Sequence, residues 1–452
     1  MWKRCCGDGS RWMLVLLLLC GMAVSLAGCA GKGTPTASYV TSAPAVRLSP
    51  AEQAAFDSTG QLDRGLSQKG KNAVLREYTR YLRQNRSSSN VIVRRSEKYL
   101  AQTREVFRRY GLPEELAYLA IVESGYNPEA VSRSGAAGAW QFMPGTGKHY
   151  GLAKDDWLDE RMDPYKSADA AARYLKRLYQ HFGNWYLAVA AYNAGEGKVA
   201  RARDRAGCRD FFELVERNHR LSAGVRLKDE TLAYVPRLLA VVKIMRNLDT
   251  LGFAPIYPER EERMVPLRAQ PGTDLMALAK ASNMPWAKFR AGNTAHKHQI
   301  TSAYQMTVVY VPESRRALAQ AHLRTASPTR YRLYTVKSGD TWRSISRQGG
   351  VEVPALLAVN QGVRLKTGIR LVVPDGNIAG QTRLAEQKRP AAGRLVSDAA
   401  EATVRQATHI VQAGDSMWSI ARRYKVKPQD LMRWNNTDGG NLQPGDRVVI
   451  RM

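Results

Sequence analysis

Residues 113–128 read PEELAYLAIVESGYNP, a segment with helical periodicity and a carboxylate at the end of its apolar face. Pro113 is favoured at the start of a helix. Leu116, Leu119 and Glu123 then fall on one face. Because burying a charged carboxylate is costly, desolvation there would raise the pKa of Glu123 and keep the group protonated near neutral pH. A neutral carboxylic acid can donate a proton to a leaving oxygen, which is how glycosidases open a sugar linkage. On these residues alone, Glu123 could instead face solvent or pair with one of the many arginines.

The sequence on both sides of this segment has the period of amphipathic helices. Apolar residues recur at three- and four-residue steps over residues 92–110, with lysines and arginines between them. A second apolar stripe follows over residues 168–182, and residues 234–248 close the set. We therefore predict an all-α domain over residues 51–255.

Two segments near the C-terminus repeat one another with an offset of 75 residues. Each has a short strand pattern, then Gly-Asp at Gly339 or Gly414, then Leu-x-x-x-Asn, and each ends in a second strand pattern. A repeat of this kind indicates duplicated small domains, which we place at residues 331–375 and 407–452.

A weaker third copy and a linker complete the C-terminal half. Residues 260–315 keep parts of the repeat pattern, including strand patterns at both ends. Residues 376–406 have no apolar periodicity and are predicted to be a linker.

The N-terminus resembles a bacterial lipoprotein signal. Basic residues precede an apolar run that is shorter than the roughly 20 residues of a membrane-spanning helix. The run ends in Leu-Ala-Gly-Cys at Cys29. The resemblance implies removal of residues 1–28, acylation of Cys29 and, because Ala30 follows the cysteine, the outer membrane of a Gram-negative bacterium, facing the periplasm. Residues 29–50 are rich in Gly, Ser, Thr, Ala and Pro, and we predict that they form a tether. The alternative is a plain signal peptide with an incidental cysteine.

The cysteines and the charge limit the remaining chemistry. Of five cysteines only Cys208 would remain free, which excludes an intramolecular disulfide and a cysteine-based metal site in the mature chain. The seven histidines show no ligand spacing, so we predict no metal ion and no cofactor. A net charge of +28 favours polyanionic partners such as an acidic cell-wall polymer, an anionic membrane or nucleic acid. Export makes nucleic acid the least suitable of these, and no nucleic-acid-binding motif supports it.

Four blocks follow one another in the predicted helical domain. They are Glu123-Ser-Gly-Tyr-Asn-Pro128 with Ser132, Gly135-Ala-Ala-Gly-Ala-Trp-Gln-Phe-Met-Pro144, Ala191-Tyr-Asn-Ala-Gly195 and Glu230-Thr-x-x-Tyr234-Val235. In this order they resemble the soluble-lytic-transglycosylase family, whose catalytic domain is similar to goose-type lysozyme. The resemblance implies an all-α lysozyme-like catalytic domain that cleaves the glycan strands of peptidoglycan.

The resemblance also implies roles for the residues nearest the reaction. Glu123 matches the only catalytic acid and base of the family. Tyr192 and Asn193 match the block that orients the substrate near this acid, and Tyr234 matches the tyrosine that faces the catalytic carboxyl group. Tyr192 could instead be a packed helix residue.

The block between them corresponds to the wall of the sugar site. Ser132 and Gln141 match positions that line this site, and Met143 matches the packing wall beside it. Met143 and its neighbour Trp140 could instead be core residues.

The reaction implied by the resemblance needs a single carboxylate. Glu123 would protonate the oxygen between N-acetylmuramic acid and N-acetylglucosamine and then accept the proton of the muramoyl 6-hydroxyl, which closes a 1,6-anhydro ring. An ordinary glycosidase uses two carboxylates, and Asp155, Asp156, Asp159 and Asp163 all follow the motif. A lysozyme-like hydrolase is therefore the nearest alternative, followed by a non-catalytic peptidoglycan-binding lipoprotein.

The C-terminal repeats resemble LysM modules, which are small βααβ units that bind chains containing N-acetylglucosamine. Asp340 and Asp415 suit the start of a helix, and Asn360 and Asn435 are predicted to fix a turn rather than to contact sugar. Weak modules linked to an enzyme raise its effective substrate concentration. Residues 260–315 lack most of the pattern, and we do not assign glycan binding to them.

Overall fold

The computed structural model describes five parts of the chain: residues 47–84, 86–327, 330–360, 363–374 and, with short gaps, 406–451. Residues 1–46 lie outside it, including the predicted signal, Cys29 and most of the predicted tether. The predicted linker lies outside it up to residue 405, as does Gly414. The chain divides into two compact units, Met1–Thr382 and Arg383–Met452.

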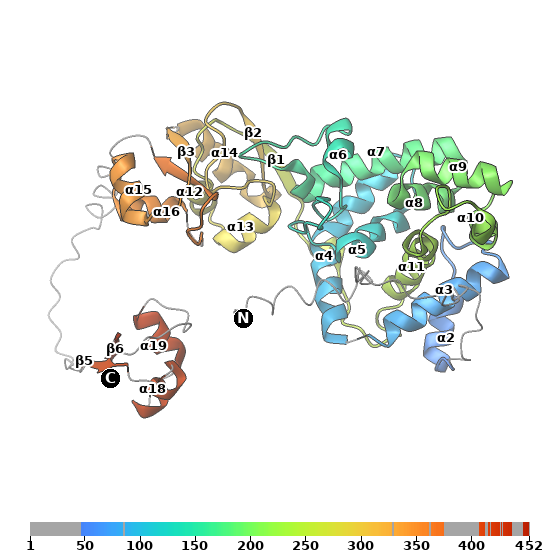
Figure 1. The fold of residues 1–452 in the computed structure, drawn as a ribbon, viewed down its shortest axis with the longest axis horizontal. Helices are drawn as coiled ribbons and strands as arrows, with labels where there is room; N and C mark the ends of the chain where they lie inside the picture. The colour runs from blue at the N-terminus through green and yellow to red at the C-terminus, as the bar shows by residue number, and fades with distance from the viewer. Residues whose placement is uncertain are drawn as a thin grey trace, which may run out of the picture. The chain divides into compact units, whose positions relative to one another are not determined.

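The first unit begins with a helical domain. Its α-helices are α2 (Pro50–Asp57), α3 (Gln68–Leu82), α4 (Arg86–Arg109), α5 (Leu119–Ser124), α6 (Pro144–His149), α7 (Pro164–Phe182), α8 (Trp185–Ala194), α9 (Glu196–Ala206), α10 (Phe211–Arg217) and α11 (Asp229–Arg246). Short 3₁₀ turns are η1 (Glu114–Tyr118), η2 (Glu160–Met162), η3 (Asn218–Arg220) and, after the domain, η4 (Pro258–Arg260). The described residues of this domain form no strand between the helices, as the periodicity predicts (Figure 1).

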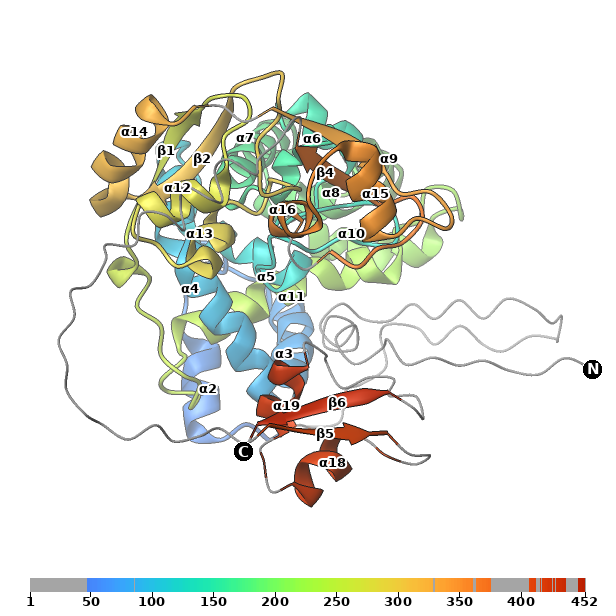
Figure 2. The same ribbon diagram turned by 90° about the vertical axis from the view of Figure 1, so that its left-hand side faces the viewer.

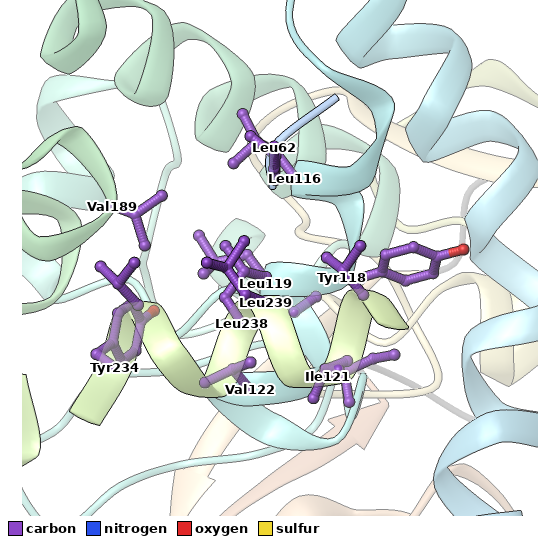
Figure 3. Close-up of a cluster of buried hydrophobic side chains, with 14 of the residues drawn as sticks. Leu62, Leu116, Tyr118, Leu119, Ile121, Val122, Val189, Tyr234, Leu238 and Leu239 are labelled. Atoms are coloured by element: carbon purple, nitrogen blue, oxygen red, sulfur yellow. The ribbon is translucent and has the colours of Figure 1, made fainter. Parts of the chain in front are cut away.

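Helices α5 and α11 lie at the centre of this domain. Helix α11 packs against α3, α5 and α8, and its residues are buried on nearly all sides. A helix without a polar face can be stable only when other helices enclose it. Figure 3 shows Leu119 and Val122 of α5 beside Leu238 and Leu239 of α11. The predicted apolar face of the segment from Pro113 is therefore in the core.

The segment from Pro113 is not one α-helix, which differs from the prediction. Residues 114–118 form the 3₁₀ turn η1, and α-helical geometry begins only at Leu119. Tight 3₁₀ turns are frequent at the N-termini of α-helices. Leu116 and Leu119 are nevertheless both fully buried, so the turn changes the helix type and not the buried face.

Three segments have the order strand, helix, helix, strand. The first comprises β1 (Met264–Ala269), α12 (Leu275–Ala281), α13 (Trp286–Gly292) and β2 (Thr307–Pro312), and the turn η5 (Glu313–Arg315) and α14 (Arg316–Thr325) follow it. The second comprises β3 (Tyr331–Thr335), α15 (Trp342–Gly349), α16 (Val353–Val359) and β4 (Arg370–Pro374), and the third β5 (Gln406–Ile410), α18 (Met417–Arg423), α19 (Pro428–Trp434) and β6 (Arg447–Arg451). In each, the two strands pair antiparallel. Figure 2 shows β1 beside β2 and β5 beside β6. Residues 260–315 thus share the backbone order of the two repeats despite their weak sequence pattern.

One asparagine ties the second helix to the last strand in all three segments. The Nδ2 of Asn360 donates to the carbonyl oxygens of Leu356 (2.8 Å) and Val372 (2.7 Å), and its Oδ1 accepts from the N–H of Val372 (2.9 Å). Asn435 makes the same three bonds in the third segment. Asn293 makes them in the first. These asparagines therefore fix the end of a helix, in agreement with the structural role predicted for Asn360 and Asn435.

The first two βααβ segments contact the helical domain. The hydroxyl of Tyr99 on α4 donates to the carbonyl oxygen of Ala291 (3.1 Å). Trp157 is buried in one apolar cluster with Ile300, Tyr331 and Val372. This cluster joins a loop of the helical domain to both segments.

Two further features bear on the predictions. Cys208 is a free cysteine, and it is buried within the helical core. Among the helices in the described part of the chain, none is both long enough and apolar enough to span a membrane.

Candidate functional site

Glu123 lies one residue before the end of α5, where the helix stops at a glycine. Gly125 takes the left-handed conformation (φ 61°), which ends the helix at Ser124. The Ser124 hydroxyl donates to the carbonyl oxygen of Ala139 (2.8 Å) and accepts from the N–H of Asn127 (3.0 Å). The end of α5 is thereby attached to the loop of residues 130–143, so the acid and this loop are held together.

Glu123 packs against the helical core but remains partly exposed, and its carboxyl group receives a hydrogen bond from Tyr234. The pKa of Glu123 is raised to about 7, mainly because the carboxyl group is shielded from water and also because the Glu230 carboxylate is nearby. The Tyr234 hydroxyl donates to Oε1 of Glu123 and acts in the opposite direction, because it stabilises the ionised form. Figure 3 shows Tyr234 on α11 within the cluster of buried hydrophobic side chains. The group can therefore be protonated or ionised near neutral pH.

Tyr192 and Asn193 lie on the last turn of α8. The Tyr192 hydroxyl donates to the carbonyl oxygen of Trp140 (2.9 Å). Burial and the charge of Glu123 raise the pKa of Tyr192 well above its ordinary value, so it stays a neutral donor. The Oδ1 of Asn193 accepts a hydrogen bond from the Thr231 hydroxyl on α11 (2.9 Å). This bond to the amide oxygen fixes the orientation of the side chain, in which the amide nitrogen is the hydrogen-bond donor.

Ser132, Gln141 and Met143 lie on the loop of residues 130–143. The Ser132 hydroxyl accepts from the N–H of Ala136 (3.0 Å), and the Gln141 amide donates to the carbonyl oxygen of Gly138 (2.8 Å), so both side chains bind within their own loop. Gln141 has a φ of 48°, an uncommon value for a residue with a side chain. Met143 is 44% exposed at the start of α6. Met143 is thus a surface residue, which excludes the alternative that it belongs to the core.

Trp140 is a core residue. Its side chain is fully buried and stacks on Phe107, with ring centroids 5.5 Å apart. Only the main chain of Trp140 reaches the site, through the bond from Tyr192. The open question about Trp140 is therefore decided in favour of packing.

The four aspartates that follow the motif have other partners. Asp155 and Asp163 accept hydrogen bonds from the backbone N–H groups two and three residues later. Burial raises the pKa of Asp163 to about 6. Asp156 and Asp159 form ion pairs with arginines. Each of the four carboxylates is therefore engaged by a neighbouring protein group. Within the described residues, no group of three or more His, Cys, Asp or Glu side chains is placed to hold a metal ion.

Sequence reasoning did not identify Ser124 and Thr231 as site residues, although both stand inside the quoted blocks. Each is a buried hydroxyl whose partner is distant in sequence, 15 residues away for Ser124 and 38 for Thr231. Ser124 directly follows Glu123, and Thr231 lies one turn before Tyr234. Both are hydroxyl residues on apolar helices, where a hydroxyl group needs a hydrogen-bond partner, and this could have identified them.

Comparison with protein-family models gives two matches. The Transglycosylase SLT domain matches residues 104–215, a range that includes Glu123 and Asn193 and ends before Tyr234. The LysM domain matches residues 334–374 and 409–451. The two LysM ranges do not include the first βααβ segment.

The chain is also similar to known lytic murein transglycosylases. Membrane-bound lytic murein transglycosylase D of Escherichia coli K12 is 32% identical over 391 residues, which cover 82% of this chain and 80% of that protein. Soluble lytic murein transglycosylase of the same strain is 34% identical over 113 residues, 23% of this chain and 18% of that protein. Among solved structures, an inactive mutant of lytic transglycosylase Slt from Pseudomonas aeruginosa matches with 26% identity and a TM-score of 0.26, over 35% of this chain and 25% of that one.

Proposed function

Because this chain belongs to the lytic murein transglycosylase family, we propose that it cleaves peptidoglycan glycan strands with Glu123 as its only catalytic carboxylate. The bond is the β-1,4 linkage between N-acetylmuramic acid and N-acetylglucosamine, and the product carries a 1,6-anhydro-muramoyl end. The observation that supports this assignment most directly is the Glu123 carboxyl group, whose pKa is raised to about 7. A group with this pKa can donate a proton and accept one in the same catalytic cycle at neutral pH.

The reaction uses the two states of Glu123 in turn. The protonated carboxyl group gives its proton to the glycosidic oxygen while the bond from that oxygen to C1 of the muramoyl residue breaks. The resulting carboxylate then accepts the proton of the muramoyl 6-hydroxyl, whose oxygen forms the new bond to C1. Water is not consumed, and Glu123 returns to its protonated state.

The surrounding residues act by holding Glu123 and the sugar. Tyr234 binds the carboxyl group and stabilises it when it is ionised between the two proton transfers. The Asn193 amide nitrogen is oriented to donate to the substrate, and Tyr192 holds the main chain of Trp140. Ser132, Gln141 and Met143 form the wall along which the glycan lies.

The remaining parts of the chain keep the enzyme at its substrate. The LysM modules at residues 331–375 and 407–452 bind the glycan strand and raise its concentration near Glu123. The acylated Cys29 anchors the chain to the outer membrane, and residues 29–50 form the tether. The family of membrane-bound relatives supports a location in the envelope of a Gram-negative bacterium.

Digestion of purified murein by the full chain tests the proposed reaction, with products identified by mass spectrometry. Anhydro-muramoyl ends are expected, since the ring closes without water. Reducing ends would identify a lysozyme-like hydrolase. Binding to murein without release of fragments would identify a peptidoglycan-binding lipoprotein.

Tyr234→Phe is expected to move the pH profile of cleavage. The first step needs protonated Glu123, so activity falls as pH rises through the pKa near 7. The Tyr234 hydroxyl lowers that pKa, and its removal should shift the fall in activity to higher pH. Initial rates on soluble glycan strands between pH 5 and 9 measure the shift. Tyr110→Phe is the matched control, because Tyr110 also donates to a carboxylate, that of Asp169 (2.9 Å). An unchanged or lower midpoint in Tyr234→Phe would contradict the assignment of Tyr234.

A further inference from the structure

A buried ion pair lies beside the loop of residues 130–143, which we call the sugar-site loop. The pair has no part in the reaction described above. Nε and Nη2 of Arg161 lie 2.9 and 2.7 Å from the two carboxylate oxygens of Asp159. Both side chains are 4% exposed. Removing two charges from water is costly, and an apolar pair of the same volume is often at least as stable. The pair therefore calls for a role other than stability alone.

The third nitrogen of the guanidinium group binds the loop of residues 130–143 at two points. Nη1 of Arg161 donates to the carbonyl oxygens of Gly135 (2.8 Å) and Phe142 (2.9 Å). Between these two carbonyls the chain turns back on itself, since Ala137 and Phe142 pair through both of their N–H groups. One guanidinium group thus holds both ends of the turn that carries Gln141.

The loop also lies directly on the main chain of Arg161. A Cβ atom at Gly138 would be 1.7 Å from the Arg161 carbonyl oxygen, a distance that no side chain can occupy. Gly138 has a φ of 85°, in the region that favours glycine. The position of Arg161 therefore sets the position of the loop.

Arg161 is held in turn by the first βααβ segment. The N–H of Asp159 donates to the carbonyl oxygen of Ala295 (2.9 Å), and the N–H of Lys297 donates to that of Trp157 (2.9 Å). The Thr294 hydroxyl donates to the carbonyl oxygen of Met162 (2.6 Å). Residues 157–162 are thereby fixed between the sugar-site loop and this segment.

We propose that Arg161 is a positioning residue of the cleavage reaction, which holds the wall of the sugar site against a support formed by residues 294–297. The inference rests on the proposed function. Only the planar guanidinium group can serve two carboxylate oxygens and two carbonyl oxygens at once, because its donors point in fixed and different directions. In this way the first βααβ segment, to which we assign no glycan binding, supports the wall of the sugar site.

Arg161→Lys tests the proposal in the full chain. Lysine keeps the charge and can still pair with Asp159, but it cannot reach both carbonyls of the loop. We expect KM for soluble glycan strands to rise and kcat/KM to fall by about 10²-fold, since small displacements of substrate-binding groups have effects of this size. The pH midpoint should not move, because Tyr234 and Glu230, which tune Glu123, lie on α11.

Arg173→Lys is the matched control. Arg173 also pairs with a carboxylate, Asp169 (2.9 Å), and donates to a carbonyl oxygen, that of Tyr150 (2.8 Å), but it does not bind the sugar-site loop. A purely structural role for Arg161 would reduce the folded fraction, which lowers apparent kcat and leaves KM unchanged. That result, or a kcat/KM within twofold of the control, would overturn the proposal.

Thr294→Val decides the matter if Arg161→Lys does not fold. The change preserves the shape of the side chain and removes one hydrogen bond to Met162. A rise in KM of about threefold, the value of one neutral hydrogen bond, is expected. An unchanged KM would refute the support role of residues 294–297. A wild-type chain that releases no anhydro-muramoyl ends would instead refute the proposed function, so the two failures are distinguishable.

Discussion

Glu123→Gln is expected to reduce kcat for release of anhydro-muramoyl products by about 10³-fold or more, because one side chain acts as both acid and base. The amide has nearly the shape of the carboxyl group but cannot give up its proton at neutral pH. The Tyr234 hydroxyl can still donate to the amide oxygen, so binding of glycan strands should change little. Product release is measured by mass spectrometry, and binding is measured by sedimentation with insoluble murein.

Glu129→Gln is the control for this change. Glu129 lies in the loop that follows α5 and pairs only loosely with Arg290, 3.6 Å away, with 59% of its side chain exposed. Its removal should leave cleavage within about twofold of wild type, since exposed ion pairs contribute little. Appreciable activity in Glu123→Gln would show that another group supplies the proton and would reject the single-carboxylate reaction.

Lys243→Met is expected to destabilise the helical domain by about 3 kcal/mol, because it removes the close cation of the buried Asp63 carboxylate and leaves only Arg246, 3.9 Å away. Lys243 lies on α11, and its Nζ is 2.5 Å from Oδ2 of Asp63 and 2.9 Å from the carbonyl oxygen of Ser58. The side chains of Lys243 and Asp63 are 5% and 2% exposed. The pair ties the central helix to the segment between α2 and α3. Differential scanning calorimetry of the full chain should show the transition of the helical domain at a lower temperature.

Lys69→Met provides the comparison for an exposed pair. Nζ of Lys69 lies 2.7 Å from Glu216, and these side chains are 70% and 48% exposed. Its loss should cost less than about 1 kcal/mol, which is the usual limit for surface ion pairs. Equal effects of the two substitutions would mean that burial of Asp63 does not govern the stability of this region.

The features that sequence reasoning predicted correctly are those encoded within short segments. The apolar face that ends at Glu123 depends only on spacing within one short helical segment, and the structure places Leu116 and Leu119 in the core. The two C-terminal repeats were detectable because each carries the whole pattern within a few tens of residues. Asn360 is an example, because its partners lie four and twelve residues away.

The features that it did not predict depend on contacts between distant segments. Arg161 stands in an unremarkable run, Asp-Glu-Arg-Met-Asp, and its importance comes from carbonyls that lie 19 and 26 residues earlier. The hydrogen bond between Thr231 on α11 and Asn193 on α8 joins two residues that are 38 positions apart in the sequence. Trp140 could not be assigned to core or site because apolar character suits both, and only its packing on Phe107 decides.

The asparagine shared by the three βααβ segments stabilises the fold of a segment and does not determine what the segment binds. Asn293, Asn360 and Asn435 bind only main-chain atoms, so the framework tolerates almost any change in the exposed side chains around it. A copy built this way can lose its recognition surface and still fold. In our proposal the first segment supports the loop of residues 130–143, while residues 334–374 and 409–451 match the LysM domain.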